Sequence, residues 1–340
     1  MFELKLMLQK RLIKRKLVKN QEKVSNEVKE SSPAKALGLA VLKFALLAFF
    51  GVIILFPFFY MISISMMNDS QAQSLKDQFE LLPHIGKGTT YISGHVYLKE
   101  WSVVVANTYK RAMATGYGQA VLLTSLNVVI SVFLKIFITF LMGYAFALRS
   151  WRGKGVVWFI ALALLVLPEV ALLSGQYQVI LSLKLYRTYF TFLLAIAFPF
   201  SASIFNTVMY KNAFEAIPGR IKEVSLVDGA GGIKYLFKVA FPMVMPTTLT
   251  IVILTALSSW NAYLWPSLIS TIGGQDFEVI SVWLFKAGVD LSDPESGANT
   301  YQNVKLAASI MAILPVFVFY LFFRKRIMGA ISRQGSAIKG

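Results

Sequence analysis

Long runs of apolar residues decide most of what this chain can fold into. The first run, residues 36–62, reads ALGLAVLKFALLAFFGVIILFPFFYMI, and others follow along the 340 residues. A soluble domain could bury a core without such runs, whereas a hydrocarbon layer about 30 Å thick requires roughly 20 apolar residues per helix. With 56% hydrophobic and only 15% charged residues, the sequence predicts a membrane protein that crosses the bilayer several times.

The apolar runs also set the expected organisation of the chain. We expect an all-α, polytopic membrane protein with six transmembrane helices, at residues 36–62, 119–148, 156–182, 189–210, 240–269 and 304–323. The first helix is too long for a signal-peptide core and lacks a small-residue cleavage site, so we expect an uncleaved anchor. The expected divisions are an arm (1–35), a first transmembrane helix (36–66), an outer loop (67–118), a five-helix core (119–324) with a cytoplasmic loop (212–241), and a cytoplasmic tail (325–340).

The distribution of basic residues predicts the orientation of these helices. If the N-terminus lies inside the cell, the segments on the cytoplasmic side hold 23 Lys and Arg residues and those on the outer side hold 8. Because Lys and Arg accumulate in cytoplasmic loops, this bias favours six spans with both termini inside. The net charge of +17 then reflects membrane topology, and we expect a lipid bilayer around the chain and no nucleic-acid partner.

The chain has few of the side chains that commonly bind metal ions. The chain has no cysteine, which excludes disulfides and thiolate metal sites. Its two histidines, His84 and His95, both fall in the polar outer loop. We therefore expect no metal site.

The arm at residues 1–35 holds ten Lys and Arg residues and four Glu. Its stretch KLMLQKRLIKRKLVK suggests a basic helix near anionic lipid, although a helical wheel does not separate its apolar residues from its charges. A disordered, positively charged anchor on the cytoplasmic side explains the same composition. The sequence leaves both readings open.

The expected cytoplasmic loop contains the most distinctive segment, EVSLVDGAGGIKYLFKVAFP at residues 223–242. Pro218 suits the start of a short helix over residues 218–228, and Gly229 can end it in the left-handed conformation. After a turn through residues 230–232, an apolar face predicts a second helix, with Ile233, Leu236, Phe237 and Ala240 at helical spacing. Residues 218–242, named here the glycine-turn motif, would form a compact projection able to transmit force, although an ordinary interfacial loop remains an alternative.

The glycine-turn motif resembles the signature loop of ABC-importer permeases, whose pattern is Glu-Ala-Ala, three residues, Gly, nine residues, Ile, one residue, Leu, Pro. Glu223, Gly229 and Pro242 fall at the matching positions. Asp228 and Ala230 match the Asp-Gly-Ala form found in carbohydrate-type members. The departures from the pattern are Val224, Ser225, Val239 and Phe241. Of these, Val224 and Ser225 leave open how tightly the loop fits a partner.

Three further stretches resemble the same family, and together the matches cover residues 120–340. YAFALRSWRGKG (144–155) is similar to the stretch that closes the second span, and SSWNAYLWPSLI (258–269) is similar to a Trp-Asn-x-Phe…Pro element. RQGSAIKG at the C-terminus is similar to the tail of the second permease in maltose-type importers. In the Trp-Asn element, Tyr263 stands where Phe is usual.

The resemblance implies a permease in the bacterial cytoplasmic (inner) membrane that lines a path with a second permease. It implies two ATPase subunits that receive the signature loop and an extracytoplasmic solute-binding protein that delivers a sugar. The chain lacks a phosphate-binding loop ending in Gly-Lys-Ser/Thr, so we expect no enzymatic activity and no bound cofactor, with ATP-Mg on the partner ATPases. The implied ATPase-coupling residues are Glu223, Ser225, Asp228, Gly229, Ala230 and Pro242, and the implied tail contacts are Gln334, Gly335, Lys339 and Gly340.

Polar and aromatic residues inside the expected spans are candidates for the solute path. Glu169 follows Pro168 well inside an apolar run, where a charge needs a reason, and we hypothesise that it faces the path or pairs with Lys135. Packing against a second permease is the rival explanation. Sugar sites combine aromatic faces with amide and hydroxyl groups, and the candidates of this kind are Gln176, Trp260, Asn261 and Tyr263.

Two other classes of protein are weaker explanations of the same sequence. A self-contained secondary transporter usually has two similar halves and several intramembrane carboxylates, whereas this chain shows no repeat and one such residue, Glu169. An intramembrane enzyme would need clustered catalytic groups, and no expected span contains a histidine. The solute stays open: a di- or oligosaccharide is the first expectation, followed by polyols and glycerol-phosphate esters.

Overall fold

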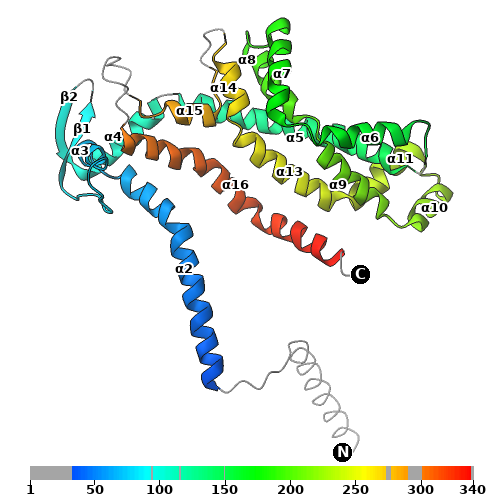
Figure 1. Cartoon of the computed structure of the whole chain (residues 1–340), viewed down its shortest axis with the longest axis horizontal. Helices are drawn as coiled ribbons and strands as arrows, with labels where there is room; N and C mark the ends of the chain where they lie inside the picture. Colours follow the sequence, from blue (N-terminus) through cyan, green and yellow to red (C-terminus); the bar gives the residue numbers. More distant parts are fainter. Residues whose placement is uncertain are drawn as a thin grey trace, which may run out of the picture. The chain divides into compact units, whose positions relative to one another are not determined.

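The computed structural model describes residues 33–92, 95–114, 116–148, 150–272, 277–289 and 301–337, and these are mostly helical (Figure 1). The chain divides into two units, Met1–Phe59 and Tyr60–Gly340. Nearly all of the expected basic arm lies outside the described residues. The same holds for Lys339 and Gly340 at the other end of the chain.

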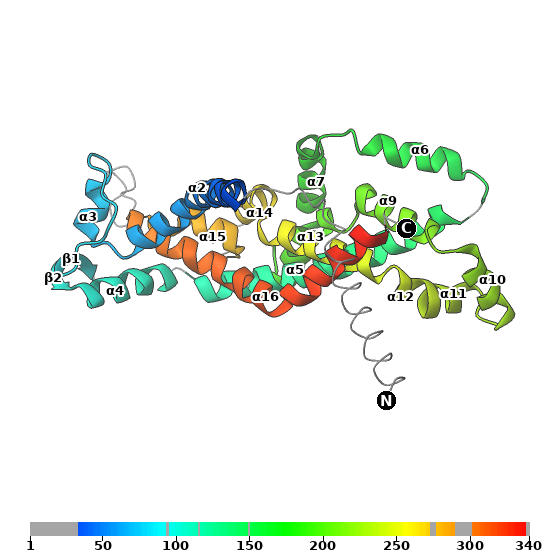
Figure 2. The same cartoon turned by 90° about the horizontal axis from the view of Figure 1, so that it is seen from below.

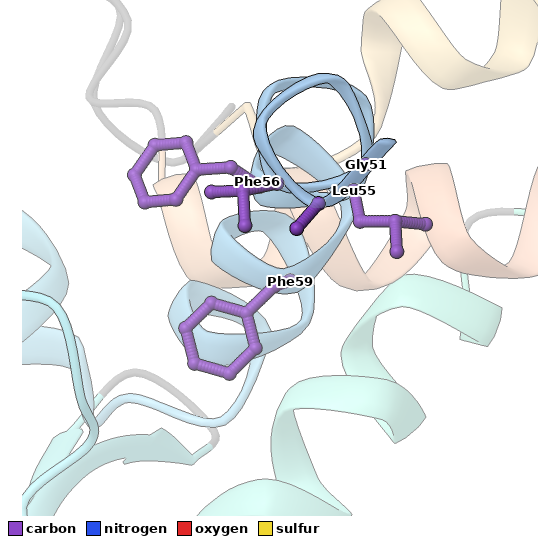
Figure 3. Close-up of a pocket in the computed structure, with 6 residues that line it drawn as sticks. Gly51, Leu55, Phe56 and Phe59 are labelled. Carbon is purple, nitrogen blue, oxygen red and sulfur yellow. The ribbon is translucent and has the colours of Figure 1, made fainter. Parts of the chain in front are cut away.

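Helix α2 (Pro33–Ser65) contains the first apolar run and begins three residues before the expected span. Its stretch Leu37–Ser65 is long and apolar enough to cross a membrane. Most side chains from Leu37 to Phe59 are exposed, as suits a helix with an apolar environment around it. Because Gly51 has no side chain, α2 carries a shallow apolar hollow of about 450 Å³ (Figure 3), lined by Ala48, Gly51, Val52, Leu55, Phe56 and Phe59.

The expected outer loop is a folded segment, and part of it corrects the all-α prediction. After α3 (Asp69–Ser74), strands β1 (Lys87–Ile92) and β2 (His95–Glu100) form an antiparallel pair, with Lys87 opposite Glu100. Both strands are rich in β-branched and aromatic residues, which fit a pleated surface. Helix α4 (Trp101–Ala114) follows.

Asp69 links this segment to the last helix, α16 (Gln302–Ala337). Its carboxylate is buried and accepts hydrogen bonds from Arg111 Nη2 at 2.5 Å and Asn303 Nδ2 at 2.7 Å. The backbone N–H of Tyr91 donates to the second carboxylate oxygen at 2.8 Å. Since these partners come from β1, α4 and α16, one buried charge joins three elements.

Two of the expected spans in the second unit are continuous helices. Helix α5 (Tyr117–Ala147) matches the expected span 119–148 closely. Helix α16 covers the expected span 304–323 but continues to residue 337, so the described part of the expected tail is helical. Pro315 lies inside α16.

The other expected spans are interrupted. The run 156–182 forms α6 (Lys154–Leu164) and α7 (Glu169–Leu183), and the run 189–210 forms α8 (Tyr189–Ala197), the 3₁₀ turn η1 (Phe198–Phe200) and α9 (Ile204–Glu215). The run 240–269 forms mainly α13 (Met245–Trp260) and α14 (Leu264–Ser270). Pro168 and Pro199 stand at the first two breaks, where proline disfavours helical geometry in the residue before it.

These breaks change how many helices can cross a membrane on their own. Among the described residues, three helices are long and apolar enough: Leu37–Ser65, Tyr117–Ala147 and Gln302–Arg324. Two bent pairs raise the number to five, one bent by 60° between residues 200 and 204 and one by 73° between residues 243 and 245. The prediction of six spans therefore did not include the breaks that interrupt three of them.

Helix α5 is the main packing element of the second unit. It packs against α8, α9 and α13, and the views in Figures 1 and 2 agree on the position of α9 and α13 beside it. Gly143 on α5 permits close approach, because a Cβ atom there would lie 2.4 Å from Cβ of Tyr210 on α9. The short helix α15 (Ile280–Lys286) also contacts α5.

Candidate functional site

The first half of the glycine-turn motif is helix α10 (Gly219–Val227), with Pro218 as its N-cap. The helix ends in a Schellman motif, in which the N–H of Ala230 donates to Ser225 O at 2.7 Å and the N–H of Gly229 donates to Leu226 O at 3.1 Å. Gly229 has φ of 68°, the left-handed conformation that the sequence predicted for it. The turn is therefore fixed by backbone geometry that favours glycine.

The second half of the motif departs from the expected helix. Helix α11 (Gly232–Tyr235) continues into the π-helical segment η2 (Leu236–Ala240) and then α12 (Phe241–Met243). Of the predicted apolar face, Leu236 and Ala240 are buried as expected, and the other two residues are not. Ile233 and Phe237 are exposed, and the buried side chains are Tyr235, Leu236 and Ala240.

These buried side chains attach the motif to the helices beneath it. They belong to one cluster with Phe140 of α5 and with Tyr210 and Phe214 of α9. The Phe140 ring lies 5.5 Å from the Tyr210 ring and 5.3 Å from the Phe214 ring, centroid to centroid. The motif is therefore packed against α5 and α9 through aromatic side chains.

The opposite side of the motif is an exposed apolar surface. Val227 is 87% exposed and Ile233 is 76% exposed. The same motif carries exposed charged side chains, namely the cationic Arg220, Lys222, Lys234 and Lys238 and the acidic Glu223 and Asp228. Exposed apolar side chains together with charged ones are typical of a surface that binds another protein.

The predicted coupling residues take different places in this geometry. Glu223, Asp228 and Pro242 are exposed and Ala230 is half-buried. Ser225 is buried, and its Oγ donates to Ile221 O at 2.6 Å, so Ser225 supports the turn from inside. A Cβ at Gly229 would have no atom of this chain within 4 Å, which leaves its outer side open.

The candidate path residues Trp260, Asn261 and Tyr263 surround the break between α13 and α14. Asn261 and Tyr263 are exposed and Trp260 is half-buried. The Asn261 amide donates to Leu257 O at 2.9 Å. The Tyr263 ring lies 4.3 Å from the Phe285 ring, which belongs to α15. Aromatic faces and an amide thus meet at a gap in the helix.

The other two path candidates lie on α7. Glu169 is its first residue, and the Glu169 side chain is outside the described part of the chain, so its suggested pairing with Lys135 stays a prediction. Lys135 is buried on α5, with Nζ 5.9 Å from the Phe200 ring centroid. Gln176 is half-buried in the middle of α7, and no hydrogen bond or ring contact between described residues joins it to the 260–263 break.

Residues 135–333, more than half of the chain, match the protein family described as "Binding-protein-dependent transport system inner membrane component". The chain belongs to this family. It is a multi-pass, inner-membrane permease subunit of an ABC transporter, a transport component without a catalytic domain. As a binding-protein-dependent permease it works with an ATPase and with a solute-binding protein.

Individual relatives support this assignment. The permease is 37% identical over 303 residues to a probable ABC transporter permease protein of Mycoplasma genitalium, covering 88% of this chain and 89% of the relative. It is 26% identical over 227 residues to the arabinooligosaccharides permease AraQ of Halalkalibacterium halodurans (66% and 74% covered). It is 24% identical over 275 residues to the sn-glycerol-3-phosphate permease UgpE of Yersinia pestis (81% and 89% covered).

A solved structure shares the fold. A chain of a bacterial ABC transporter that imports the acidic polysaccharide alginate superposes with a TM-score of 0.66 at 23% identity, covering 88% of the permease and 99% of that chain. At this identity the likeness establishes the ABC permease fold alone.

The sequence analysis missed a buried polar stripe on α5 of the permease. Asn127 Nδ2 donates to Ser259 Oγ on α13 at 2.9 Å, and Ser131 Oγ donates to Asn127 Oδ1 at 3.3 Å. The stripe consists of Thr124, Asn127, Ser131, Lys135 and Thr139, all buried. Their spacing of three and four residues within an apolar helix was a visible signal of one polar face.

The predicted tail contacts are only partly placed. Gln334 and Gly335 belong to the last turns of α16, and their side chains lie outside the described part of the permease. Lys339 and Gly340 follow the described residues. Contact between the tail and an ATPase stays a prediction.

Proposed function

We propose that this permease is one of two membrane subunits of an ATP-driven importer for a sugar or oligosaccharide. The glycine-turn motif is the coupling element of that importer. The observation that supports this most directly is the two-sided construction of the motif. Its outer side exposes apolar and charged side chains, and its inner side is packed on α5 and α9.

The proposed mechanism transmits force without covalent chemistry in this chain. Two ATPase subunits bind ATP-Mg and close, and each carries the coupling motif of one permease with it. Because the turn is fixed by Gly229 and the inner side is fixed by Phe140 and Tyr210, the motif moves as a rigid lever. The spans that line the path then rearrange and open toward the outside, where an extracytoplasmic binding protein releases the solute. The chain binds no cofactor itself.

The proposed coupling residues act through different surfaces. Exposed Glu223 and Asp228 are placed to pair with cationic side chains of the ATPase, and Gly229 lets the ATPase approach the backbone. Ser225, Ala230 and Pro242 maintain the shape of the motif. The tail residues Gln334, Gly335, Lys339 and Gly340 form a second, smaller ATPase contact.

We also propose six membrane passes with both termini in the cytoplasm. Three continuous helices account for three passes and the bent pair of α8 and α9 accounts for a fourth; α13 with α14 and α6 with α7 account for the other two as interrupted helices. The 23-to-8 distribution of basic residues supports this orientation. Interrupted helices inside a bilayer need neighbouring protein or water at the break, which a second permease and a shared path provide.

We propose a carbohydrate as the transported solute. Two of the proteins that this permease resembles are named for saccharides, arabinooligosaccharides and alginate. Another is named for sn-glycerol 3-phosphate, so a phosphorylated polyol is the rival solute. The exposed Tyr263 ring and Asn261 amide favour a sugar.

Co-purification tests the coupling role of the motif. The tagged permease is expressed with its candidate ATPase and second permease, and ATPase retention is compared between wild type and Gly229→Asn. Asparagine tolerates the left-handed conformation, and no atom of the chain obstructs a Cβ there. The variant is therefore expected to fold normally and to lose the ATPase.

Gly116→Asn is the matched control. Gly116 has φ of 87° and equally open surroundings, but it precedes α5 at the opposite end of that helix from the motif. We expect this variant to retain the ATPase. Undiminished retention by Gly229→Asn, or equal loss in both variants, contradicts the proposed role.

A further inference from the structure

The break between α13 and α14 presents two aromatic rings in contact, tilted by 37° relative to each other. Tyr263 is 40% exposed and Phe285 is 55% exposed, with their ring centroids 4.3 Å apart. Phe285 comes from α15, which the sequence did not connect with the solute path. We propose that Tyr263, Phe285 and Asn261 form a contact surface for a neutral sugar ring on this permease. The proposal rests on the proposed function as an importer.

Helix α15 is anchored on one side and presents Phe285 on another. Ile280 and Trp283 are almost fully buried, and they pack in a cluster with Ala307 and Ala308 of α16. The Trp283 ring also lies 5.2 Å from the Tyr117 ring of α5, centroid to centroid. Figures 1 and 2 both place α15 next to α14. The position of Phe285 is therefore set by a packed core beneath it.

Hydrogen bonds hold α15 and the break together. The N–H of Ile280 donates to Thr124 Oγ1 at 2.8 Å, and Ser281 Oγ donates to the carbonyl of Ala262 inside the break. One turn of α5 further on, Asn127 fixes Ser259 just before Trp260. Two residues of the polar stripe on α5 thus act as positioning residues, and the aromatic pair is pre-organised for binding.

The backbone at the break argues against a lipid-facing surface. Residues 261–263 are not helical, and α13 before them is 16 residues long, about 24 Å at 1.5 Å per residue. With Met245 at the cytoplasmic boundary, as the proposed orientation has it, the break falls within a hydrocarbon layer about 30 Å thick. Non-helical backbone at this depth must face water or protein. The exposed Asn261 amide must likewise face water or protein, which can satisfy its hydrogen-bonding groups.

The chemistry of the surface favours a neutral ring. One face of a pyranose or furanose presents C–H groups that pack on aromatic rings, while an amide serves its hydroxyl groups. The nearest cation on α15, Lys286, forms an ion pair with Glu278. A phosphate ester would require cationic groups free to bind it. The surface therefore fits the saccharide class better than glycerol phosphate.

Cysteine labelling of the assembled transporter tests the surface. The chain has no cysteine, so Leu264→Cys, beside the pair and half exposed, is the reporter for a membrane-impermeant thiol reagent in proteoliposomes. The probes are arabinose, glucose and maltotriose, with sn-glycerol 3-phosphate as the anionic comparison. A sugar at twice its Kd leaves about one third of sites free, so labelling is expected to slow about threefold.

Two further variants test whether the Phe285 ring is needed for binding of the sugar. Phe285→Ala in the reporter background is expected to abolish protection by the sugars, and Phe285→Tyr, which keeps a ring, is expected to retain it. Absence of labelling, absence of protection by every sugar, protection only by sn-glycerol 3-phosphate, or equal protection in Phe285→Ala each overturns the proposal. The proposed function is judged separately, by ATPase retention and by the ATP dependence of labelling without sugar.

Discussion

Gly143 offers a direct test of how the permease core is packed. A Cβ atom at this position of α5 would lie 2.4 Å from Cβ of Tyr210, 3.1 Å from the backbone N of Lys211 and 3.2 Å from the backbone O of Thr207. Two of these atoms belong to the backbone of α9 and cannot rotate away. Any side chain at residue 143 must therefore move one helix relative to the other.

The magnitude follows from these distances. Carbon atoms in contact lie about 3.5–4.0 Å apart, so Gly143→Ala requires α9 to shift by roughly 1 Å. Overpacking of this kind costs about 1–3 kcal/mol. Alanine contributes up to about 1 kcal/mol of helix propensity in the opposite direction. Subtracting the gain in propensity from the steric cost leaves an expected net loss of up to about 2 kcal/mol.

Thermal unfolding of the purified permease in one detergent, followed by tryptophan fluorescence, measures this loss as a lower midpoint. Gly118→Ala on the same helix is the matched control, since no atom lies within 4 Å of a Cβ there. We expect its midpoint to be unchanged or higher. A midpoint for Gly143→Ala at or above wild type would refute the reasoning, because the backbone contact would then impose no constraint.

Further predictions concern a strained residue, a buried charge and the topology. Lys184 ends α7 with φ of 54°, which costs a residue with a side chain about 1–2 kcal/mol, so Lys184→Gly should raise the midpoint of thermal unfolding. Asp69→Ala leaves Arg111 without its carboxylate and should lower stability by about 3–5 kcal/mol, measured in the same assay. In intact cells, an impermeant maleimide should label Val96→Cys and reach Val227→Cys only after permeabilisation; the reverse pattern contradicts the proposed orientation.

The sequence was most informative where one physical effect dominates. Long apolar runs predicted α2, α5 and α16, because a lipid environment demands uninterrupted hydrophobicity. Gly229 predicted the end of α10, since glycine adopts the left-handed conformation without steric cost. Both features depend on local sequence and need no knowledge of distant contacts.

Breaks and strands were harder to predict. Pro168 and Pro199 were visible, yet hydropathy continues across both, so the runs were treated as single spans. The β1–β2 pair was hidden in a segment taken as an outer loop, although its alternating β-branched and aromatic residues were a readable signal. The π-helical segment η2 had no local signal that we recognise, and Tyr235 is buried in the motif's second half where Ile233 and Phe237 were expected to be.

The candidate site was predictable only in part, because some of its residues are brought together by contacts between distant parts of the sequence. The residues of the glycine-turn motif are consecutive, so one stretch of sequence revealed them together. Phe285 joins Tyr263 through tertiary packing, and residues 22 positions apart give no periodic signal. Ser225 was assigned to ATPase coupling without its burial being foreseen, because residue type alone does not show which side of a short helix faces inward.

The π-helical segment η2 should tolerate changes of residue type better than changes in the number of its residues. Its five residues lie between the turn at Gly229 and α13, and each residue added to or removed from a helix turns everything before it by about 100°. Substitutions at exposed Lys238 should therefore be tolerated, whereas deletion of Lys238 should rotate the apolar surface away from the ATPase and abolish its retention. On this basis, homologous permeases should vary freely in sequence here and yet keep the same number of residues from Gly229 to Met245.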